Sequence, residues 1–93
     1  MKENELLAYG SIVALKGIAN PILIIGINQT AEEKNYDYCG CIHPYGYING
    51  ESLILFNNAD IEKVIFNGYV DDLLKDYYDD VIWLRDKQKK EDK

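Results

Sequence analysis

The chain has few of the residues that support metal or thiol chemistry, since its 93 positions include two cysteines and one histidine. It also lacks a long apolar run. The longest, residues 21–27, has about a third of the length that spans a bilayer. Residues 1–8 pass from charged side chains to leucines without the apolar stretch of a signal peptide. These absences argue against membrane insertion and export, and we expect a soluble cytoplasmic protein.

Basic residues are also scarce, because 10 lysines and arginines face 16 acidic residues and the net charge is −6. Four of the bases lie in residues 87–93, so residues 1–86 carry 14 acidic and 6 basic side chains. This negative field repels phosphate backbones and anionic lipid. We therefore expect no nucleic-acid and no membrane partner. A protein partner with a basic or apolar surface fits better, and a homo-oligomer stays open.

The length and the 47% hydrophobic content indicate one folded domain over residues 1–93. Segments rich in β-branched residues and bounded by Gly, Pro or Asn predict five strands, at about residues 11–16, 21–28, 36–43, 52–56 and 62–67. The second is apolar on both faces, which predicts a central strand. Polar residues 28–35 predict a solvated hairpin connection. Asn49-Gly50 predicts a type I′ turn that joins residues 45–48 to the fourth strand.

From Val70 onward the spacing of apolar residues changes to three and four, which predicts an amphipathic helix over about residues 70–88. Its predicted packing stripe consists of Val70, Leu73, Leu74, Tyr77, Val81 and Leu84. The predicted fold is mainly β with a C-terminal helix (α+β). Five antiparallel strands over about residues 9–68 form a small SH3-like open barrel or a curled meander. The predicted frayed ends are residues 1–6 and 89–93.

Cys39, Cys41 and His43 have the composition of a metal site, and alternate residues of a strand share a face. A structural zinc site needs a fourth ligand, however, and the chain has no other cysteine or histidine. Two buried, reduced thiols are the favoured interpretation. We therefore predict no metal and no cofactor, and Cys41 with His43 as a catalytic pair is a weaker hypothesis because a strand holds them apart.

Two groups of residues are candidates for binding a protein. Aspartates on the predicted helix fit a solvated face better than a calcium loop, and Asp76, Asp79 and Asp80 could steer a basic partner. The aromatic candidates are Tyr36, Tyr38, Tyr45, Tyr47, Tyr69, Tyr78 and Trp83. Packing in the core explains some of these rings, and the remainder could form an exposed platform for a peptide or a helix. Tyr78, Ile82 and Trp83 lie outside the predicted packing stripe and are expected to contact a partner.

Four segments carry a resemblance to a known family: residues 10–17 (GSIVALKG), 36–41 (YDYCGC), 43–47 (HPYGY) and 64–69 (VIFNGY). Together they resemble small Gram-positive proteins grouped as domain of unknown function 4176. The resemblance covers most of residues 9–70. It implies a cytosolic accessory protein encoded beside type VII secretion genes, acting as a chaperone or targeting factor for an exported toxin. No catalytic or binding residue is implied.

These observations predict a protein-binding chaperone or targeting adaptor for a secreted type VII toxin. An immunity protein that neutralises a cognate toxin is the alternative, because such proteins are often acidic as well. A thiol-dependent or metal-dependent enzyme is the third hypothesis, and we expect no enzymatic activity.

Overall fold

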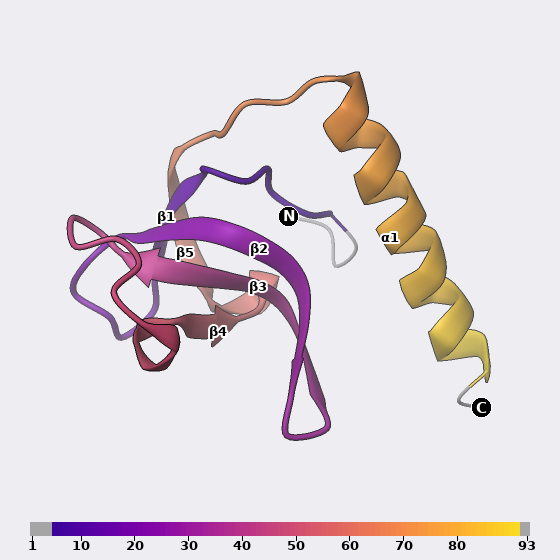
Figure 1. Ribbon diagram of the computed structural model, residues 1–93, viewed down its shortest axis with the longest axis horizontal. Helices are drawn as coiled ribbons and strands as arrows, with labels where there is room; N and C mark the ends of the chain where they lie inside the picture. The colour runs from indigo at the N-terminus through magenta and orange to yellow at the C-terminus, as the bar shows by residue number, and fades with distance from the viewer. Residues whose placement is uncertain (1–4, 92–93) are drawn as a thin grey trace.

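The computed structural model describes residues 5–91, with side chains as far as residue 87. Its elements are β1 (Ile12–Leu15), β2 (Ile22–Ala31), β3 (Lys34–Ile42), η1 (Gly50–Ser52), β4 (Ile54–Phe56), η2 (Asn58–Asp60), β5 (Ile61–Phe66) and α1 (Asp72–Glu91). The five strands form one antiparallel sheet in the order β4-β3-β2-β1-β5 (Figure 1). In the described residues β4 does not pair with β5, so the curved sheet is not closed into a barrel. The predicted fold class, mainly β with a C-terminal helix, is confirmed.

The central strand is β2, as its sequence predicts. Ile22 and Ile24 are fully buried and Ile27 is 4% exposed, so all three face the core. Strict alternation would place residues 24 and 27 on opposite faces. The register against β3 shifts between Ile24 and Gly26, and this bulge leaves Ile25 exposed. The bulge bends β2 around the core, so one face of the strand is buried from Ile22 to Ile27, whereas Ile25 on the other face is 41% exposed.

One predicted connection is shorter than expected and another is wrong. Residues 28–35 do form a largely exposed hairpin connection, but β2 and β3 extend through most of it and leave a two-residue turn at Glu32 and Glu33. Asn49-Gly50 is not a hairpin turn, because Asn49 has φ −161° and its side chain accepts a hydrogen bond from the Ser52 N–H. A type I′ turn requires positive φ at both central residues. Residues 45–48 form no strand, so the predicted hairpin lacks its first arm.

Helix α1 lies beside the sheet, and residues 5–9, here called the N-terminal segment, run between the two (Figure 1). The side chain of Asp71 caps α1 by accepting the Leu74 N–H at 2.9 Å. The prediction of a frayed end is wrong for residues 5 and 6, since Leu6 packs against the core and the Glu5 carbonyl accepts a hydrogen bond from Asn58. Residues 89–91 are helical. Residues 1–4, 92 and 93 lie outside the described residues.

The face of α1 that packs on the domain differs from the predicted stripe. Leu74, Tyr78 and Val81 contact the core cluster. The predicted stripe members that are largely exposed are Val70, Leu73, Tyr77 and Leu84. The inner face continues to Arg85, whose guanidinium pairs with Asp37. Because this charged residue interrupts the apolar pattern, the sequence favoured the neighbouring face. Within the described residues, no helix has the length and apolar character needed to cross a bilayer.

Candidate functional site

Two tyrosine hydroxyls hold the N-terminal segment between the sheet and α1. The Leu7 N–H donates to the Tyr38 hydroxyl on β3 at 2.9 Å, and the Tyr78 hydroxyl on α1 donates to the Leu7 carbonyl at 2.8 Å. Both backbone groups of Leu7 are therefore satisfied by side chains, as buried polar groups require. We call this arrangement the tyrosine clamp. It fixes the distance between α1 and the N-terminal segment.

Burial sets the ionisation of both clamp residues. It raises the pKa of Tyr38 to about 12, and it also raises the pKa of Tyr78 above the usual value for tyrosine. A tyrosine hydroxyl is neutral at physiological pH in any case, and the raised pKa keeps both hydroxyls protonated and able to donate into the alkaline range. The Tyr38 hydroxyl donates to the Asn58 side chain. The clamp acts as a structural support, because its polar groups are engaged with one another and point inward.

A second link between α1 and the sheet lies about two turns further along the helix, at Arg85. Arg85 donates to one carboxylate oxygen of Asp37, and the Asn58 N–H donates to the other at 2.8 Å. The side chains of Arg85 and Asp37 are 19% and 13% exposed. The second terminal nitrogen of Arg85, Nη1, is buried and has no partner among the described residues. This ion pair and the clamp together determine how α1 sits on the domain.

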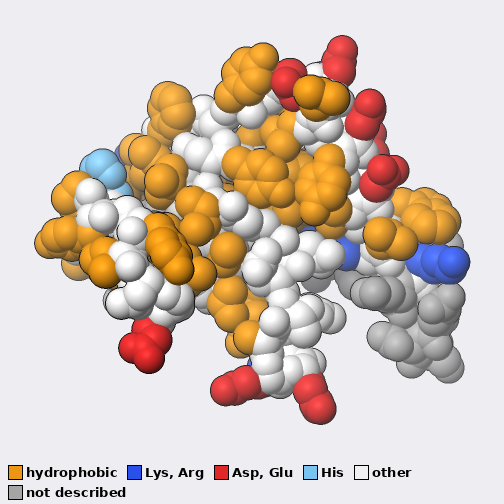
Figure 2. All heavy atoms as spheres, viewed as in Figure 1, with side chains coloured by type: hydrophobic (Ala, Val, Ile, Leu, Met, Phe, Trp, Pro, Cys, Tyr) orange, Lys and Arg blue, Asp and Glu red, His pale blue; other side chains and the backbone are white. Residues whose placement is uncertain are grey.

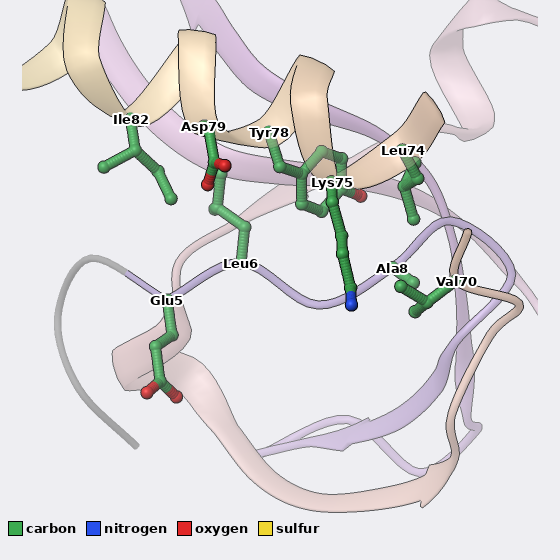
Figure 3. Close-up of a pocket in the computed structure, with 9 residues that line it drawn as sticks. All are labelled: Glu5, Leu6, Ala8, Val70, Leu74, Lys75, Tyr78, Asp79 and Ile82. Atoms are coloured by element: carbon green, nitrogen blue, oxygen red, sulfur yellow. The ribbon is translucent and has the colours of Figure 1, made fainter. Parts of the chain in front are cut away.

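A groove opens between α1 and the N-terminal segment (Figure 3). Its volume is about 440 Å³, and its apolar lining is Leu6, Ala8, Val70, Leu74, Tyr78 and Ile82. The charged lining residues are Glu5, Lys75 and Asp79. We call it the helix groove. Leu6 and Ala8 point into it because alternate residues of an extended segment share a side, while the α1 residues follow at intervals of four and so share a helix face.

The opposite flank of α1 carries an exposed aromatic surface, defined here as the aromatic face and formed by Tyr9, Tyr69, Leu73 and Tyr77. These residues line a second hollow of about 450 Å³. Tyr69 and Leu73 are 79% and 81% exposed, and Tyr77 is 50% exposed. The Tyr9 ring packs edge-on against Tyr78 with centroids 5.6 Å apart, which joins this face to the clamp. Apolar side chains thus flank the first two turns of α1 on both sides.

The predicted acidic residues lie on the surface of α1. Asp76, Asp79 and Asp80 are all exposed, and Asp79 lies at the helix groove. Figure 2 shows acidic side chains along the outer side of the N-terminal half of α1, beside the apolar side chains that gather between helix and sheet. Trp83 is 59% exposed, and the Lys87 ammonium lies 5.3 Å from its ring centroid.

The predicted tyrosines do not form one surface. Tyr38 and Tyr78 belong to the core, at 0% and 8% exposed, so they cannot contribute to an exposed platform. Tyr36 is half-buried on β3. Tyr45 and Tyr47 are 67% and 60% exposed in the loop that follows β3. This loop is a separate exposed aromatic region.

Cys39 and Cys41 are free and buried, as the sequence predicts, whereas His43 is exposed beyond the end of β3. The Cys39 sulfur packs against Gly26, where an added Cβ would lie 2.7 Å from it. Burial raises the pKa of the Cys39 thiol, which lowers its thiolate fraction. No three His, Cys, Asp or Glu side chains of the described part of the chain converge as a metal site would.

Sequence reasoning missed the N-terminal segment and the two links that hold α1. The predicted frayed end includes Leu6, and no role is predicted for Ala8, although their alternation with Leu7 and Tyr9 is typical of an extended segment with two different sides. The interval of four from Leu74 through Tyr78 to Ile82 was also present. It was passed over because the neighbouring stripe holds more apolar residues.

The model of one protein family, described as Domain of unknown function (DUF4176), matches residues 6–76. The match includes most of the N-terminal segment, the whole sheet and the first turn of α1. Comparison with curated proteins and with solved structures found no match.

Proposed function

The chain belongs to the family described as Domain of unknown function (DUF4176), a description that names no function, and we propose from the surface of the structure that the chain is a cytoplasmic protein-binding accessory factor. The partner is a secreted toxin of a type VII system, and the chain acts on it as a chaperone or a targeting adaptor. The type VII context follows from the family resemblance of the sequence motifs. The proposal assigns no catalytic residue and no cofactor.

The observation that carries the proposal is the exposed aromatic face beside an acidic helix. Tyr69, Leu73 and Tyr77 are at least half exposed, although burying such a side chain contributes about 1.5–3 kcal/mol. Contiguous exposed apolar residues with a polar rim are typical of protein interfaces. The aspartates of α1 supply that rim and favour approach of a basic surface. Trp83 is a further exposed aromatic anchor on the same helix.

The test uses the purified chain and the toxin encoded beside it, divided into an N-terminal secretion half and a C-terminal effector half. Isothermal titration calorimetry should detect binding to the N-terminal half. Binding to the effector half alone, with loss of its toxicity, would establish an immunity protein instead. No binding to either half would reject both roles.

Surface variants locate the interface. Leu73→Ser should weaken binding of the toxin half by about 1–3 kcal/mol, because a buried anchor residue typically contributes this much. Trp83→Ala is expected to fall in the same range. The matched control is Ile65→Ser on β5, which is 50% exposed and lines neither the helix groove nor the aromatic face. Circular dichroism checks that each variant is folded. If Leu73→Ser and Ile65→Ser bind equally well, the aromatic face is not the interface.

A further inference from the structure

The helix groove has the dimensions of a site for a short stretch of another helix. Leu74 and Ile82 lie eight residues apart along one wall, a rise of about 12 Å, with the buried Tyr78 between them. Leu6 and Ala8 form the facing wall, and Val70 closes one end (Figure 3). A groove of this length accepts about two turns of helix with apolar residues at i, i+3 or i+4, and i+7.

The clamp keeps the groove open and rigid. Tyr78 is fixed by its hydrogen bond to the Leu7 carbonyl, and Leu7 is fixed to β3 through Tyr38. The wall formed by the N-terminal segment therefore does not depend on a ligand for its position. A preformed apolar groove binds more tightly than one that must be ordered, because less conformational entropy is lost.

The N-terminal segment is a poor template for an extended peptide. Adding a strand requires a row of free backbone N–H and C=O groups. Both groups of Leu7 are used by the clamp, the Glu5 carbonyl accepts from Asn58, and the Ala8 carbonyl accepts the Ser11 N–H. Side chains therefore have to provide the recognition, which favours a helix over a strand as the occupant.

The charged residues that line the groove are Glu5, Asp79 and Lys75, so its lining is acidic by one charge, and the other aspartates of α1 add to a negative field that favours a basic partner. Residues 71–86 contain six aspartates and two bases, Lys75 and Arg85. Arg85 is paired with Asp37, which leaves Lys75 as the one base of this stretch outside the ion pairs of the described residues. Glu5 and Asp79 are acidic lining residues on the two opposite walls. A helix with lysine or arginine beside its apolar residues would meet carboxylates on both sides.

We infer that the helix groove binds a basic amphipathic α-helix of a partner protein. The inference rests on the proposed function and deepens it, because it adds a second contact site, on the other flank of α1 from the aromatic face, and names the chemistry of the partner segment that this site takes.

The probes are synthetic peptides of about 16 residues, long enough to cover the groove. One is a helical leucine–lysine peptide, the second replaces its lysines by glutamates, and the third alternates leucine and lysine as a strand would. Binding is followed by ¹H–¹⁵N and methyl NMR of the labelled full chain. The helical basic peptide should bind about tenfold or more tighter than either control peptide at low salt. Its shifts should centre on Leu6, Ala8 and Ile82.

Charge variants give matched tests that spare the core. Lys75→Glu should tighten binding of the basic helical peptide about three- to tenfold, and Asp79→Lys should weaken it by a similar factor. Lys63→Glu and Glu62→Lys make the same charge changes on the exposed part of β5 and should alter affinity less than about twofold. These differences should shrink at about 1 M salt, because screening shortens the reach of surface charges.

Three results would overturn the inference. The first is absence of binding by the helical basic peptide, or shifts confined to the aromatic face or to residues 45–48. The second is equal binding by the acidic or the alternating peptide. The third is a concentration-dependent dimer that occupies the groove by itself. The peptide assay tests the groove without the toxin, so its failure does not bear on toxin binding. If toxin binding is unchanged by Lys75→Glu and by Asp79→Lys, the groove is not part of the toxin interface, and the proposed function still stands.

Discussion

Burial divides the eight tyrosines into residues that support the fold and residues that are free to contact a partner. Tyr38 and Tyr78 are buried with their hydroxyls engaged, while Tyr45, Tyr47 and Tyr69 expose most of their rings. The sequence shows an apolar ring with a polar end at every one of these positions. Tyr38 and Tyr78 are buried because Leu7 lies between them and bonds to both hydroxyls. These partners are separated from Leu7 by 31 and 71 positions in the sequence, so no local pattern encodes the contact.

The buried tyrosines predict a loss of stability at alkaline pH. Folding raises the pKa of Tyr38 to about 12, so the folded chain keeps a proton that the unfolded chain releases near pH 10. The stabilisation is complete below about pH 10 and is lost as the pH rises towards 12. For Tyr38 alone the loss is about 2–3 kcal/mol.

The measurement is urea unfolding from about pH 8, where the two states bind the same protons, to about pH 12; the unfolded and folded chains differ most in bound protons near pH 11. Tyr38→Phe should be less stable at neutral pH by about 1–2 kcal/mol, because the Leu7 N–H loses its acceptor. Its stability should then fall less steeply above pH 10. Tyr69→Phe, at an exposed position, is the control and should follow the unaltered chain. If the free energy of unfolding falls equally steeply with pH for Tyr38→Phe and for the unaltered chain, the pKa of Tyr38 is not raised by folding.

Adding one methyl group at Gly68 is predicted to lower the stability of the fold strongly. A Cβ at this position would lie 2.0 Å from the Tyr9 carbonyl oxygen and 2.9 Å from the Ser11 nitrogen. The Gly68 N–H also donates to the buried Ser11 hydroxyl at 2.9 Å, so the two backbones cannot separate freely. Gly68→Ala should destabilise the chain by at least about 2 kcal/mol in urea unfolding. Gly50→Ala, which meets no atom within 4 Å, should change stability by less than about 0.5 kcal/mol.

At the scale of elements, the features that depend on local composition were predicted correctly from the sequence. The strand positions, the central place of β2 and the existence of α1 all follow from runs of residues with one period. The Asn49-Gly50 prediction failed because a turn sequence forms a hairpin only when strands on both sides pair. Residues 45–48 do not pair, so Asn49 caps η1 instead.

The prediction of the packing face of α1 failed for a different reason. Two apolar stripes lie side by side on the helix, and the one that packs holds fewer apolar residues and includes a charged one. Arg85 is acceptable there because Asp37 on β3 neutralises it. This compensation comes from another element, so the helix sequence alone favours the wrong stripe. The helix groove was missed along with it, since Leu74, Tyr78 and Ile82 lie on or beside the true packing face.

The β2–β3 turn is a site where the sequence departs from the preferred turn residues. Glu32 and Glu33 have φ of 50° and 67°, the left-handed conformation at both central positions of a two-residue hairpin loop. Side chains with a Cβ are strained there. Glu32→Asn with Glu33→Gly should raise the free energy of unfolding by about 1–2 kcal/mol. Glu32→Ala with Glu33→Ala removes the same charges but keeps the strain. Equal stabilisation by both pairs would mean that charge repulsion, and not backbone conformation, is relieved.

At the scale of the whole molecule, α1 is a helix attached to a curved sheet through few contacts. Leu74, Tyr78 and Val81 bury part of one face, and the Arg85–Asp37 ion pair holds the helix further along. The remaining faces carry the helix groove, the aromatic face and the exposed aspartates. The element proposed for binding is therefore also the element with the least support from the core, as is common for binding elements.

The Arg85–Asp37 pair is predicted to decide whether α1 stays on the sheet. Arg85→Met leaves Asp37 87% buried without its cation, which should cost about 2–3 kcal/mol. Asp37→Asn combined with Arg85→Met should recover part of this loss, because no charge is then left unpaired. Hydrogen exchange should rise first in residues 81–87 while β2 and β3 stay protected, since the core of the sheet does not involve Arg85. The radius of gyration, 13.4 Å for the intact fold, should increase in small-angle scattering as α1 separates. Equal loss of protection in α1 and in the sheet would show instead that helix and sheet unfold as one unit, and the ion pair would then stabilise the whole domain and not the helix alone.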